Sequence, residues 1–530
     1  MSKEILFGNE AHKKIETGVR TLAGAVKITL GPKGRNAVLE RKFASPLVTN
    51  DGVTIAKDIT LKDPFENIGC ELIKEVSIKT NEIAGDGTTT AIVLCEALVL
   101  EGFKNIASGA NPIIMRKGME KAKEIAVKEI KRLSKPVQNS TEIKQVATIS
   151  SASEKIGELI AQAMEKVSQD GIITVEESKT AQTSLNIVEG FQFDRGYISP
   201  YMTTDTNKMQ TVFTNPNILI TDKKISTSAD FINIAEILIA NGEPLVIIAE
   251  DIDGEALATL LLNKMRGSFA CVGIKAPAFG EKRKEILQDI ATLTGATYFA
   301  KDMNMDIKTA TESDLGKCKQ ITVSASQTTI IEGLGNPQQI EQRKQEIKTQ
   351  LQNAESDYDK ERLTERLGKF IGGVAVINVG SNTETEMREM KLRIEDALSA
   401  TKSATQEGIV AGGGCTYIKI IEHLKEQTKN LTGDEKTGAN IVAKALEAPV
   451  RQIAHNAGVD GGVVLNTIKQ NTDTNFGYDA LTDTYTNMLD AGIIDPAKVS
   501  RCALENAISI ASTLLTTNVV VANPNENEQN

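Results

Sequence analysis

Residues 84–90 read Ala84-Gly85-Asp86-Gly87-Thr88-Thr89-Thr90 and lead directly into the apolar run 91–100. That run predicts a helix buried on nearly every side. Gly85 and Gly87 allow positive φ and close approach of a ligand to the backbone, and Asp86 can hold a hard cation such as Mg²⁺. The threonines fall in the first helical turn, where unpaired N–H groups attract anions. The stretch indicates a phosphate site, although a helix cap after a glycine turn explains the same residues.

The size and composition of the chain predict a multidomain, soluble protein. It has 530 residues, enough for two or three compact units. With 60 Lys and Arg against 70 Asp and Glu, its net charge of −10 argues against a general nucleic-acid or acidic-membrane binder. No secretory signal is visible, and no uncharged run reaches the roughly 20 residues of a membrane span. We therefore expect a cytoplasmic protein.

The cysteines and histidines suggest no metal or disulfide framework. The six cysteines include no C-x-x-C pair, so free buried thiols are expected. The three histidines are isolated in the sequence and alone do not suggest a zinc site. Residues 522–530 are polar and Asn-rich, and we expect a disordered tail there.

The first quarter of the chain is predicted to be mainly helical. Apolar residues recur at steps of three and four from Glu10 to Leu30, and further helices are expected at 65–81, 88–108 and 112–133. The turn Thr29-Leu30-Gly31-Pro32-Lys33-Gly34-Arg35-Asn36 ends the first helix. Its glycines can admit a ligand and its cations can supply charge, but a solvated turn is an equally ordinary explanation.

A hairpin is predicted at Leu47 to Ile55, where two short strands flank an Asn-Asp-Gly turn. That interpretation makes Asp51 a turn residue. Further along, the strand 171–176 is expected to pair with 184–189. Gly190 then opens a stretch of different composition and is a hinge candidate.

The pattern becomes α/β between residues 190 and 373. Strands at 244–249 and 270–274 alternate with helices at 254–266 and 283–294, as in a β-α-β unit. The apolar residues of two helices, 231–239 and 255–265, cover about 220° and 200° of the helical wheel, where one-sided burial needs only about 100°. Either these helices are buried on two sides, or part of their apolar surface is exposed for binding.

The last third returns to helices. After a strand at 373–380 comes a helix in which Asp396 lies about 200° from Ile394, opposite the apolar stripe. Asp396 is an ordinary surface residue or a contributor to a second site. A third glycine cluster, Ala411-Gly412-Gly413-Gly414, again precedes a helix. The two ends of the chain are therefore alike in class.

Four motifs together resemble the group I chaperonins, the GroEL family, and the likeness runs from about Lys3 to Val521. They are 29–36, 85–90, Ile394-Glu395-Asp396-Ala397-Leu398 and 411–414. The resemblance implies a multidomain α and α/β fold of discontinuous plan. Its parts are a helical equatorial ATP-binding domain at 1–133 and 408–521, a small α/β intermediate domain at 134–189 and 375–407, an α/β apical polypeptide-binding domain at 190–374, and the tail at 522–530.

The resemblance also implies an activity and its partners. The expected protein is an ATPase and chaperone that uses ATP and Mg²⁺, with K⁺ as a further candidate cation. It assembles as two stacked seven-membered rings, is closed by a small cochaperonin ring, and folds non-native client polypeptides in the cavity.

Site residues carry over from the family position by position. Asp51 and Asp396 match the two carboxylates beside the γ-phosphate, and Asp86 matches the Mg²⁺ ligand. The matches for nucleotide contacts are Thr29, Leu30, Gly31, Pro32, Asp86, Gly87, Thr88, Thr89, Thr90, Gly413, Asp479, Ala480, Leu481 and Asp495. The matches for the polypeptide groove are Tyr197, Tyr201, Met202, Ile232, Ala235, Leu257, Leu261 and Leu262, and those for the hinge are Gly190, Gly372 and Gly373.

The chain departs from the family pattern at four places. Asn50 stands where lysine is usual, Ala235 is smaller than the common leucine, Asp479 replaces asparagine, and the terminal Gly-Gly-Met repeat is missing. Two other functions remain open: a small-molecule phosphotransferase, although no G-x-x-x-x-G-K-[ST] loop is present, and a scaffold that has lost efficient hydrolysis, motivated by Asn50.

Overall fold

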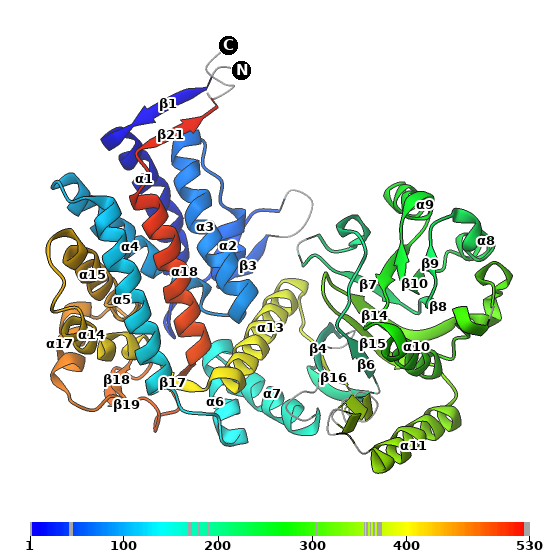
Figure 1. The fold of residues 1–530 in the computed structure, drawn as a ribbon. Coiled ribbons are helices and arrows are strands. Elements are labelled where there is room, and N and C mark those ends of the chain that lie inside the picture. The colour runs from blue at the N-terminus through cyan, green and yellow to red at the C-terminus, as the bar shows by residue number, and fades with distance from the viewer. Residues whose placement is uncertain are drawn as a thin grey trace. The chain divides into compact units, whose positions relative to one another are not determined.

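The computed structural model describes residues 3–41, 46–167, 172–178, 181–188, 190–206, 208–303, 305–354, 356, 359–360, 362–363, 366–367 and 374–523. They belong to two compact units (Figure 1). Unit 1 consists of Met1–Glu165, Val175–Ser184 and Asn378–Asn530, and unit 2 of Lys166–Thr174 and Leu185–Ile377. Both ends of the chain therefore build unit 1. The predicted hinge pair Gly372 and Gly373, and the tail from residue 524, lie outside the described residues.

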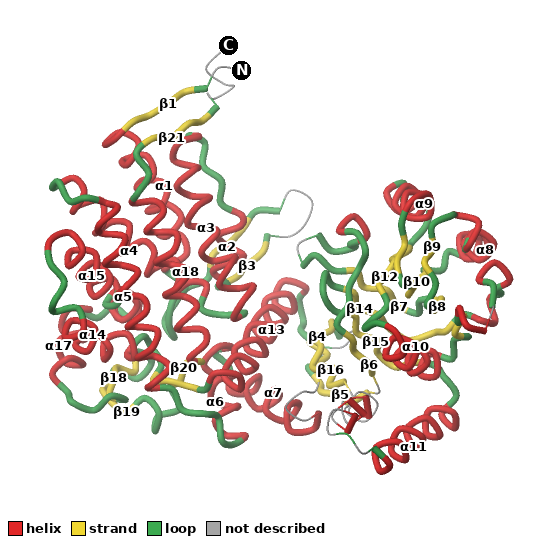
Figure 2. The backbone as a smooth tube through the Cα atoms, viewed as in Figure 1, coloured by secondary structure: helices red, strands yellow, loops and turns green. Residues whose placement is uncertain are grey.

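Long helices form the body of unit 1 (Figure 2). Helix α4 (Thr88–Ala107) is covered by α1 (Gly8–Lys27), α3 (Pro64–Ala84) and α18 (Ala497–Leu515), and α5 (Pro112–Leu133) packs on α15 (Gly433–Ala445). Residues 91–96 of α4 are all buried, as the apolar run predicted. Gly118 and Gly438 allow α5 and α15 to touch, because an added Cβ would lie 1.8 Å from Glu435 O or 2.0 Å from Met115 O. The four predicted N-terminal helices are confirmed.

The smaller elements of unit 1 lie around this bundle. The helices are α2 (Gly52–Asp58), α6 (Ser140–Ser151), α7 (Glu154–Val167), α13 (Glu384–Glu407), α14 (Cys415–Gln427), α16 (Ala448–Asn456) and α17 (Gly461–Gln470). The antiparallel strand pairs are β1 (Glu4–Phe7) with β21 (Val519–Ala522), β2 (Ala37–Leu39) with β3 (Leu47–Thr49), β17 (Ile409–Ala411) with β20 (Ile494–Pro496), and β18 (Phe476–Asp479) with β19 (Thr484–Asn487). Ala522, the first residue of the predicted tail, is thus the last residue of a strand.

Two predicted strand pairings are wrong. The Asn-Asp-Gly segment makes no hairpin, because Asp51 caps α2 and β3 pairs with β2 instead. Aspartate serves equally as a turn residue and as a helix cap, so local sequence did not separate the two. In the three-stranded sheet, β16 (Val374–Val379) stands between β4 (Ile172–Glu177) and β5 (Ser184–Val188), which were expected to pair directly.

Unit 2 is built on an eight-stranded mixed sheet in the order β12-β10-β8-β14-β15-β6, with β13 beside β8 and β7 beside β14. Strands β8, β10 and β12 are parallel, which confirms the predicted β-α-β pattern, and every residue of β8 and β10 is buried. The strands are β6 (Gly190–Phe193), β7 (Thr211–Thr214), β8 (Asn217–Thr221), β10 (Leu245–Ala249), β12 (Cys271–Lys275), β13 (Tyr298–Phe299), β14 (Gly316–Val323) and β15 (Thr328–Gly333). The helices are α8 (Ile232–Asn241), α9 (Gly254–Met265), α10 (Gly280–Thr294) and α11 (Pro337–Asn353), and β9 (Lys224–Ile225) pairs with β11 (Asp251–Ile252).

Gly190, the hinge candidate, is the first residue of β6 and pairs with Ile331 of β15. All six cysteines are buried and free, as expected. None of the helices in the described part of the chain is both long and apolar enough to span a membrane.

Candidate functional site

The turn between α3 and α4 places a carboxylate beside a helix N-terminus. Gly85 ends α3 at φ 70° and Gly87 caps α4 at φ 77°. An added Cβ would lie 2.2 Å from Ser399 Cβ at Gly85, and 2.5 Å from Val499 Cγ1 at Gly87, so both positions require glycine for space as well as for φ. The first amides of α4 have no acceptor within the helix. The turn therefore leads directly into the N-terminus of α4, and anion binding there stays a prediction.

Asp86 lies in this turn and is held by two donors. The Gly87 N–H donates to Oδ1 at 2.5 Å, and the Ser150 hydroxyl of α6 donates to Oδ2 at 2.8 Å. Burial, with a contribution from the charge of Asp51, raises the pKa of Asp86 above its ordinary value. A cation at this carboxylate relieves both effects, and Mg²⁺ is commonly held by one or two carboxylates plus water and phosphate oxygens. Among the described residues no group of three or more Asp, Glu, His or Cys side chains forms a metal site, so Asp86 alone is a candidate ligand for Mg²⁺ at this turn. Ser150 was missed, because a lone helical serine gives no signal in the sequence.

Asp51 reaches the same helix end from α2. Its carboxylate accepts from the N–H groups of Val53 at 3.2 Å and Thr54 at 3.0 Å. The next residue, Gly52, lies so close to α4 that an added Cβ would be 2.4 Å from Thr89 Oγ1. The cap thus brings a second carboxylate to the start of α4.

The turn after α1 forms another wall of the site. The hydroxyls of Thr29 and Thr89 are 3.4 Å apart. The Asn456 side-chain amide donates to Lys27 O at 2.9 Å and to Leu30 O at 2.8 Å, which fixes the turn. Gly31 has φ 86° and touches Ile453. Residues Thr29 to Pro32 are therefore held beside the threonines of α4, and Asn456 is a supporting residue that the sequence did not reveal.

The third glycine cluster meets Asp495 through a strand pair. Val410 of β17 lies opposite Asp495 of β20, and a Cβ at Gly412 would be 3.0 Å from Asp495 Oδ1. Gly413 and Gly414 both have positive φ, and Gly414 caps α14. Burial and the charge of Asp86 raise the pKa of Asp495 to about 7. Asp86 and Asp495 therefore lie near enough to repel each other when both are ionised.

Asp479 is the last residue of β18, and Ala480 and Leu481 follow it in the turn to β19. The Asp479 carboxylate accepts from the Leu481 N–H at 2.9 Å and from the Thr482 hydroxyl at 2.6 Å. Ala480 is buried and Leu481 is exposed. Strand β18 packs against α14, the helix that begins at Gly414. Asp479 shapes this turn instead of pointing a free carboxylate at a ligand.

Helix α13 carries Asp396 against the Asp86 turn between α3 and α4. The Ser403 hydroxyl donates to Ala84 O at 2.8 Å, and Ser399 is the residue that faces Gly85. Residues 396, 399 and 403 are spaced i, i+3, i+7 and share one face of the helix. Half-buried Asp396 therefore lies on the face of α13 that packs on the Asp86 turn. The helical wheel identified this face, but only the packing shows what it meets.

The raised pKa of Asp495 predicts a pH-dependent stability. Its ordinary value is 3.8 and its folded value is about 7, so between these values the folded chain binds a proton that the unfolded chain has released. The free energy of unfolding is then expected to fall as the pH rises from about 4 to 7. Thermal unfolding without nucleotide or Mg²⁺ at pH 5, 6, 7 and 8 measures this slope. Asp495→Asn should show a clearly flatter profile, and equal slopes would contradict the assignment.

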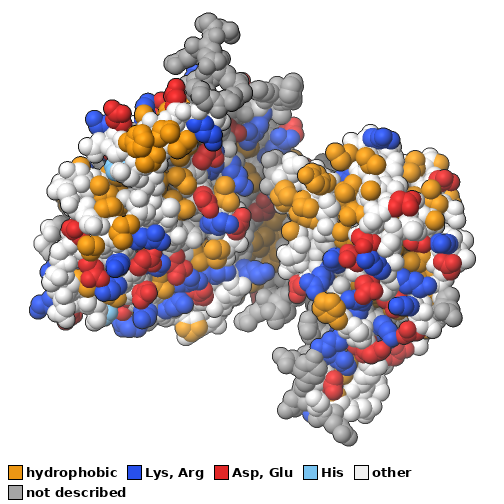
Figure 3. Space-filling model, turned by 45° about the horizontal axis from the view of Figure 1, so that its top comes forward, with side chains coloured by type: hydrophobic (Ala, Val, Ile, Leu, Met, Phe, Trp, Pro, Cys, Tyr) orange, Lys and Arg blue, Asp and Glu red, His pale blue; other side chains and the backbone are white. Residues whose placement is uncertain are grey.

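Exposed apolar side chains of unit 2 include several on α8 and α9. Of the eight residues predicted for a polypeptide groove, Tyr201 is 72% and Leu262 is 54% exposed. Ile232 is exposed as well, whereas Tyr197, Leu257 and Leu261 are partly buried and Met202 and Ala235 are buried. Ile237, Ile239 and Met265, which belong to the two wide apolar arcs but not to these eight residues, are also exposed. Figure 3 shows apolar side chains gathered on this part of unit 2. Within unit 2, the wide apolar arcs are therefore only partly covered.

Two features now stand together: a helical unit with carboxylates around a helix N-terminus, and an α/β unit with an exposed apolar surface. The model of the TCP-1/cpn60 chaperonin family matches residues 22–525. Together with these two features, the match defines the class of protein as a chaperonin. The chain belongs to the TCP-1/cpn60 chaperonin family. It is a chaperone that assembles with copies of itself and binds client polypeptides.

Proposed function

We propose that this protein is a group I chaperonin, an ATP-hydrolysing chaperone of the cytoplasm with the equatorial, intermediate and apical plan given above. It works as two stacked seven-membered rings closed by a cochaperonin ring. The observation that supports the proposal best is the meeting of three separate chain segments, Thr29 to Pro32, Asp51 and Asp86, at the N-terminus of α4.

Each part of this site has a role in phosphoryl transfer, which depends on charge neutralisation and orientation. Asp86 would hold Mg²⁺, which neutralises phosphate charge when bound. The amides of Thr88 to Thr90 and the turn at Gly31 cradle phosphate oxygens. Gly413 would contact the nucleotide, Asp495 would contact the ribose, and residues 479–481 would lie near the base. Asp51 and Asp396 orient and deprotonate the attacking water. K⁺ is a second candidate cation.

Asn50 motivates the alternative of a scaffold without efficient turnover. A neutral amide precedes Asp51, so this position supplies no positive charge to a phosphate. The three carboxylates at 51, 86 and 396 nevertheless lie on segments that meet at one turn, which favours hydrolysis.

The purified protein tests the proposal in two measurements on one preparation. Light scattering should give a particle of several hundred kilodaltons or more, and steady-state assays should give Mg²⁺-dependent ATP hydrolysis. A ring-sized particle that binds ATP without turnover would support the scaffold. A small oligomer with substrate-dependent turnover would support the phosphotransferase and overturn the proposal.

Client binding is expected to depend on Leu262. Leu262→Ser removes an exposed apolar side chain from α9 and should weaken capture of a denatured protein about tenfold, since burying such a side chain is worth roughly 1.5–3 kcal/mol. The matched control is Leu334→Ser, because Leu334 is 62% exposed in the same unit but lies away from α8 and α9. The measurement is the protein concentration needed to suppress client aggregation. Equal loss in both variants would show a general surface effect.

A further inference from the structure

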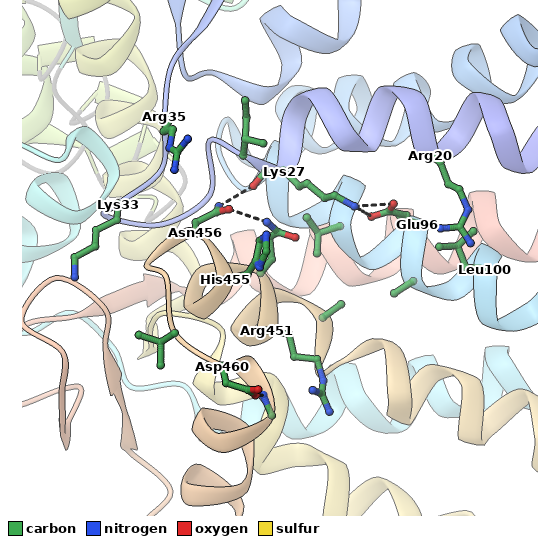
Figure 4. A pocket seen from close by; sticks show the side chains of 18 residues that line it. Arg20, Lys27, Lys33, Arg35, Glu96, Leu100, Arg451, His455, Asn456 and Asp460 are labelled. Carbon is green, nitrogen blue, oxygen red and sulfur yellow. Dashed lines mark hydrogen bonds and ion pairs between the residues drawn. The ribbon is translucent and has the colours of Figure 1, made fainter.

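A hollow of about 840 Å³ opens in unit 1 beside the turn that carries Thr29 to Pro32 of the proposed ATP site (Figure 4). Its walls come from α1, the turn that follows it, α4, α16 and the start of α17. None of the residues proposed to hold ATP lines it. Its volume lies within the roughly 300–1,000 Å³ typical of ligand pockets. We call this hollow the basic pocket.

Positive charge predominates in the basic pocket. Its cations are Arg20, Lys27, Lys33, Arg35 and Arg451, and its carboxylates are Glu96 and Asp460. The whole chain has a net charge of −10, so the positive charge of this pocket is opposite in sign to that of the chain as a whole. These positively charged side chains repel one another unless an anion lies between them.

Two of the cations have no acidic partner. Lys27 pairs with Glu96 at 2.9 Å, and Arg20 and Arg451 pair with glutamates one turn earlier on their own helices. In the part of the chain that the structure describes, Lys33 and Arg35 make no ion pair. They are the two charges of the turn 29–36 that the proposed ATP site leaves unused.

Backbone hydrogen bonds order the turn that carries these two cations, whose side chains are exposed. Gly34 N–H donates to Gly31 O, and Arg35 N–H donates to Ile28 O, both at 2.9 Å. Asn456 fixes the start of the same turn through Leu30 O at 2.8 Å. Figure 4 shows Lys33 and Arg35 on this turn, with His455 and Arg451 on the neighbouring helix. The backbone of the turn is therefore ordered without a ligand, so binding does not carry the entropic cost of ordering it.

Part of the wall of the pocket is apolar. It includes Ile28 beside the turn and Val93, Ala97 and Leu100 along one face of α4. A cleft with charges of one sign and walls of low dielectric constant concentrates the electric field. An anion in the pocket is therefore attracted more strongly than at an open surface.

From these observations we propose that the basic pocket binds a small anion with several phosphate groups. The planar guanidinium of Arg35 can pair two phosphate oxygens, and the ammonium group of Lys33 serves as a point charge. The ligand occupies a second anion site on the same unit, separate from the proposed ATP site.

The test is a calorimetric titration of the assembled protein with sodium tripolyphosphate, with and without saturating ADP. In saturating ADP, which fills the proposed ATP site, we expect one tripolyphosphate site per chain that ADP does not displace, and about tenfold or more weaker binding at it in Lys33→Gln/Arg35→Gln. The matched control is Arg116→Gln/Lys117→Gln, which removes the same two charge types from exposed positions outside the pocket and should bind as wild type.

Three results would overturn the inference. Displacement of tripolyphosphate by ADP would place it in the nucleotide site. Equal weakening in both double variants would show unspecific charge attraction. A change of particle mass in Lys33→Gln/Arg35→Gln, with tripolyphosphate binding retained, would make the pocket a contact between copies of this chain. None of these results depends on whether the protein hydrolyses ATP.

Discussion

Asp396→Ala is expected to lower steady-state ATP hydrolysis by roughly 10²–10⁴-fold, the usual contribution of a positioned general base, while ATP still binds. The reason is its position: Ser399 and Ser403, on the same face of α13, lie against Gly85 and Ala84. The phosphate-holding groups belong to other segments and stay in place. Turnover by phosphate release and binding by a fluorescent ATP analogue measure the two effects separately.

Glu386→Ala is the matched control for this variant. It removes the same charge from an exposed position of α13 that lies about 140° from Ser399 and about 100° from Ser403 around the helix. We expect turnover within about twofold of wild type. If Asp396→Ala retains normal turnover, or both variants lose it equally, Asp396 has no role in positioning the water.

Asp86→Asn is expected to act in opposite directions on binding and on stability. The amide keeps the size of the side chain but gives up the charge, so Mg²⁺-dependent nucleotide affinity should fall by about tenfold or more. The unliganded protein should unfold at a higher temperature, because the pKa of Asp86 is raised by burial and by the charge of Asp51, and its own charge raises the pKa of Asp495. Removing that buried charge relieves the repulsion.

Asp490→Asn serves as its control, since Asp490 is an exposed residue of the same unit outside the site. It should change neither the melting temperature nor the affinity. Calorimetric melting without ligand and titration with Mg-ADP give the two quantities. A lower melting temperature for Asp86→Asn would mean that its bonds to Gly87 and Ser150 stabilise the fold more than its charge destabilises it.

Local sequence determined most of the elements of this protein. The apolar run after Thr90 predicted a helix buried on nearly every side, and α4 has that burial, because hydrophobic periodicity depends only on neighbouring residues. The helix expected at 112–133 matches α5, which begins with a proline directly after its cap Asn111. The β-α-β pattern predicted the parallel strands of unit 2 in the same way.

Tertiary structure decided what these elements meet. The sequence predicted that Asp51 is a hairpin turn residue. In the structure it caps α2 and β3 pairs with β2, a pairing that no local pattern specifies. The strands β4 and β5 are separated by β16, from about 190 residues further along the chain. Ser150, Ser399 and Asn456 support the site from other segments, and a lone polar residue on a helix carries no sequence signal.

The glycines and carboxylates of the candidate site could therefore be identified from the sequence alone, because glycine favours positive φ and carboxylates are the ligands that hard cations prefer. Their arrangement in space could not be identified in this way. Asp86, Asp495 and the Gly412 turn come together only when both ends of the chain pack into one unit, and the raised pKa of Asp495 arises from that burial and from the charge of Asp86. Contacts between distant segments depend on packing, and packing is a property of the folded chain.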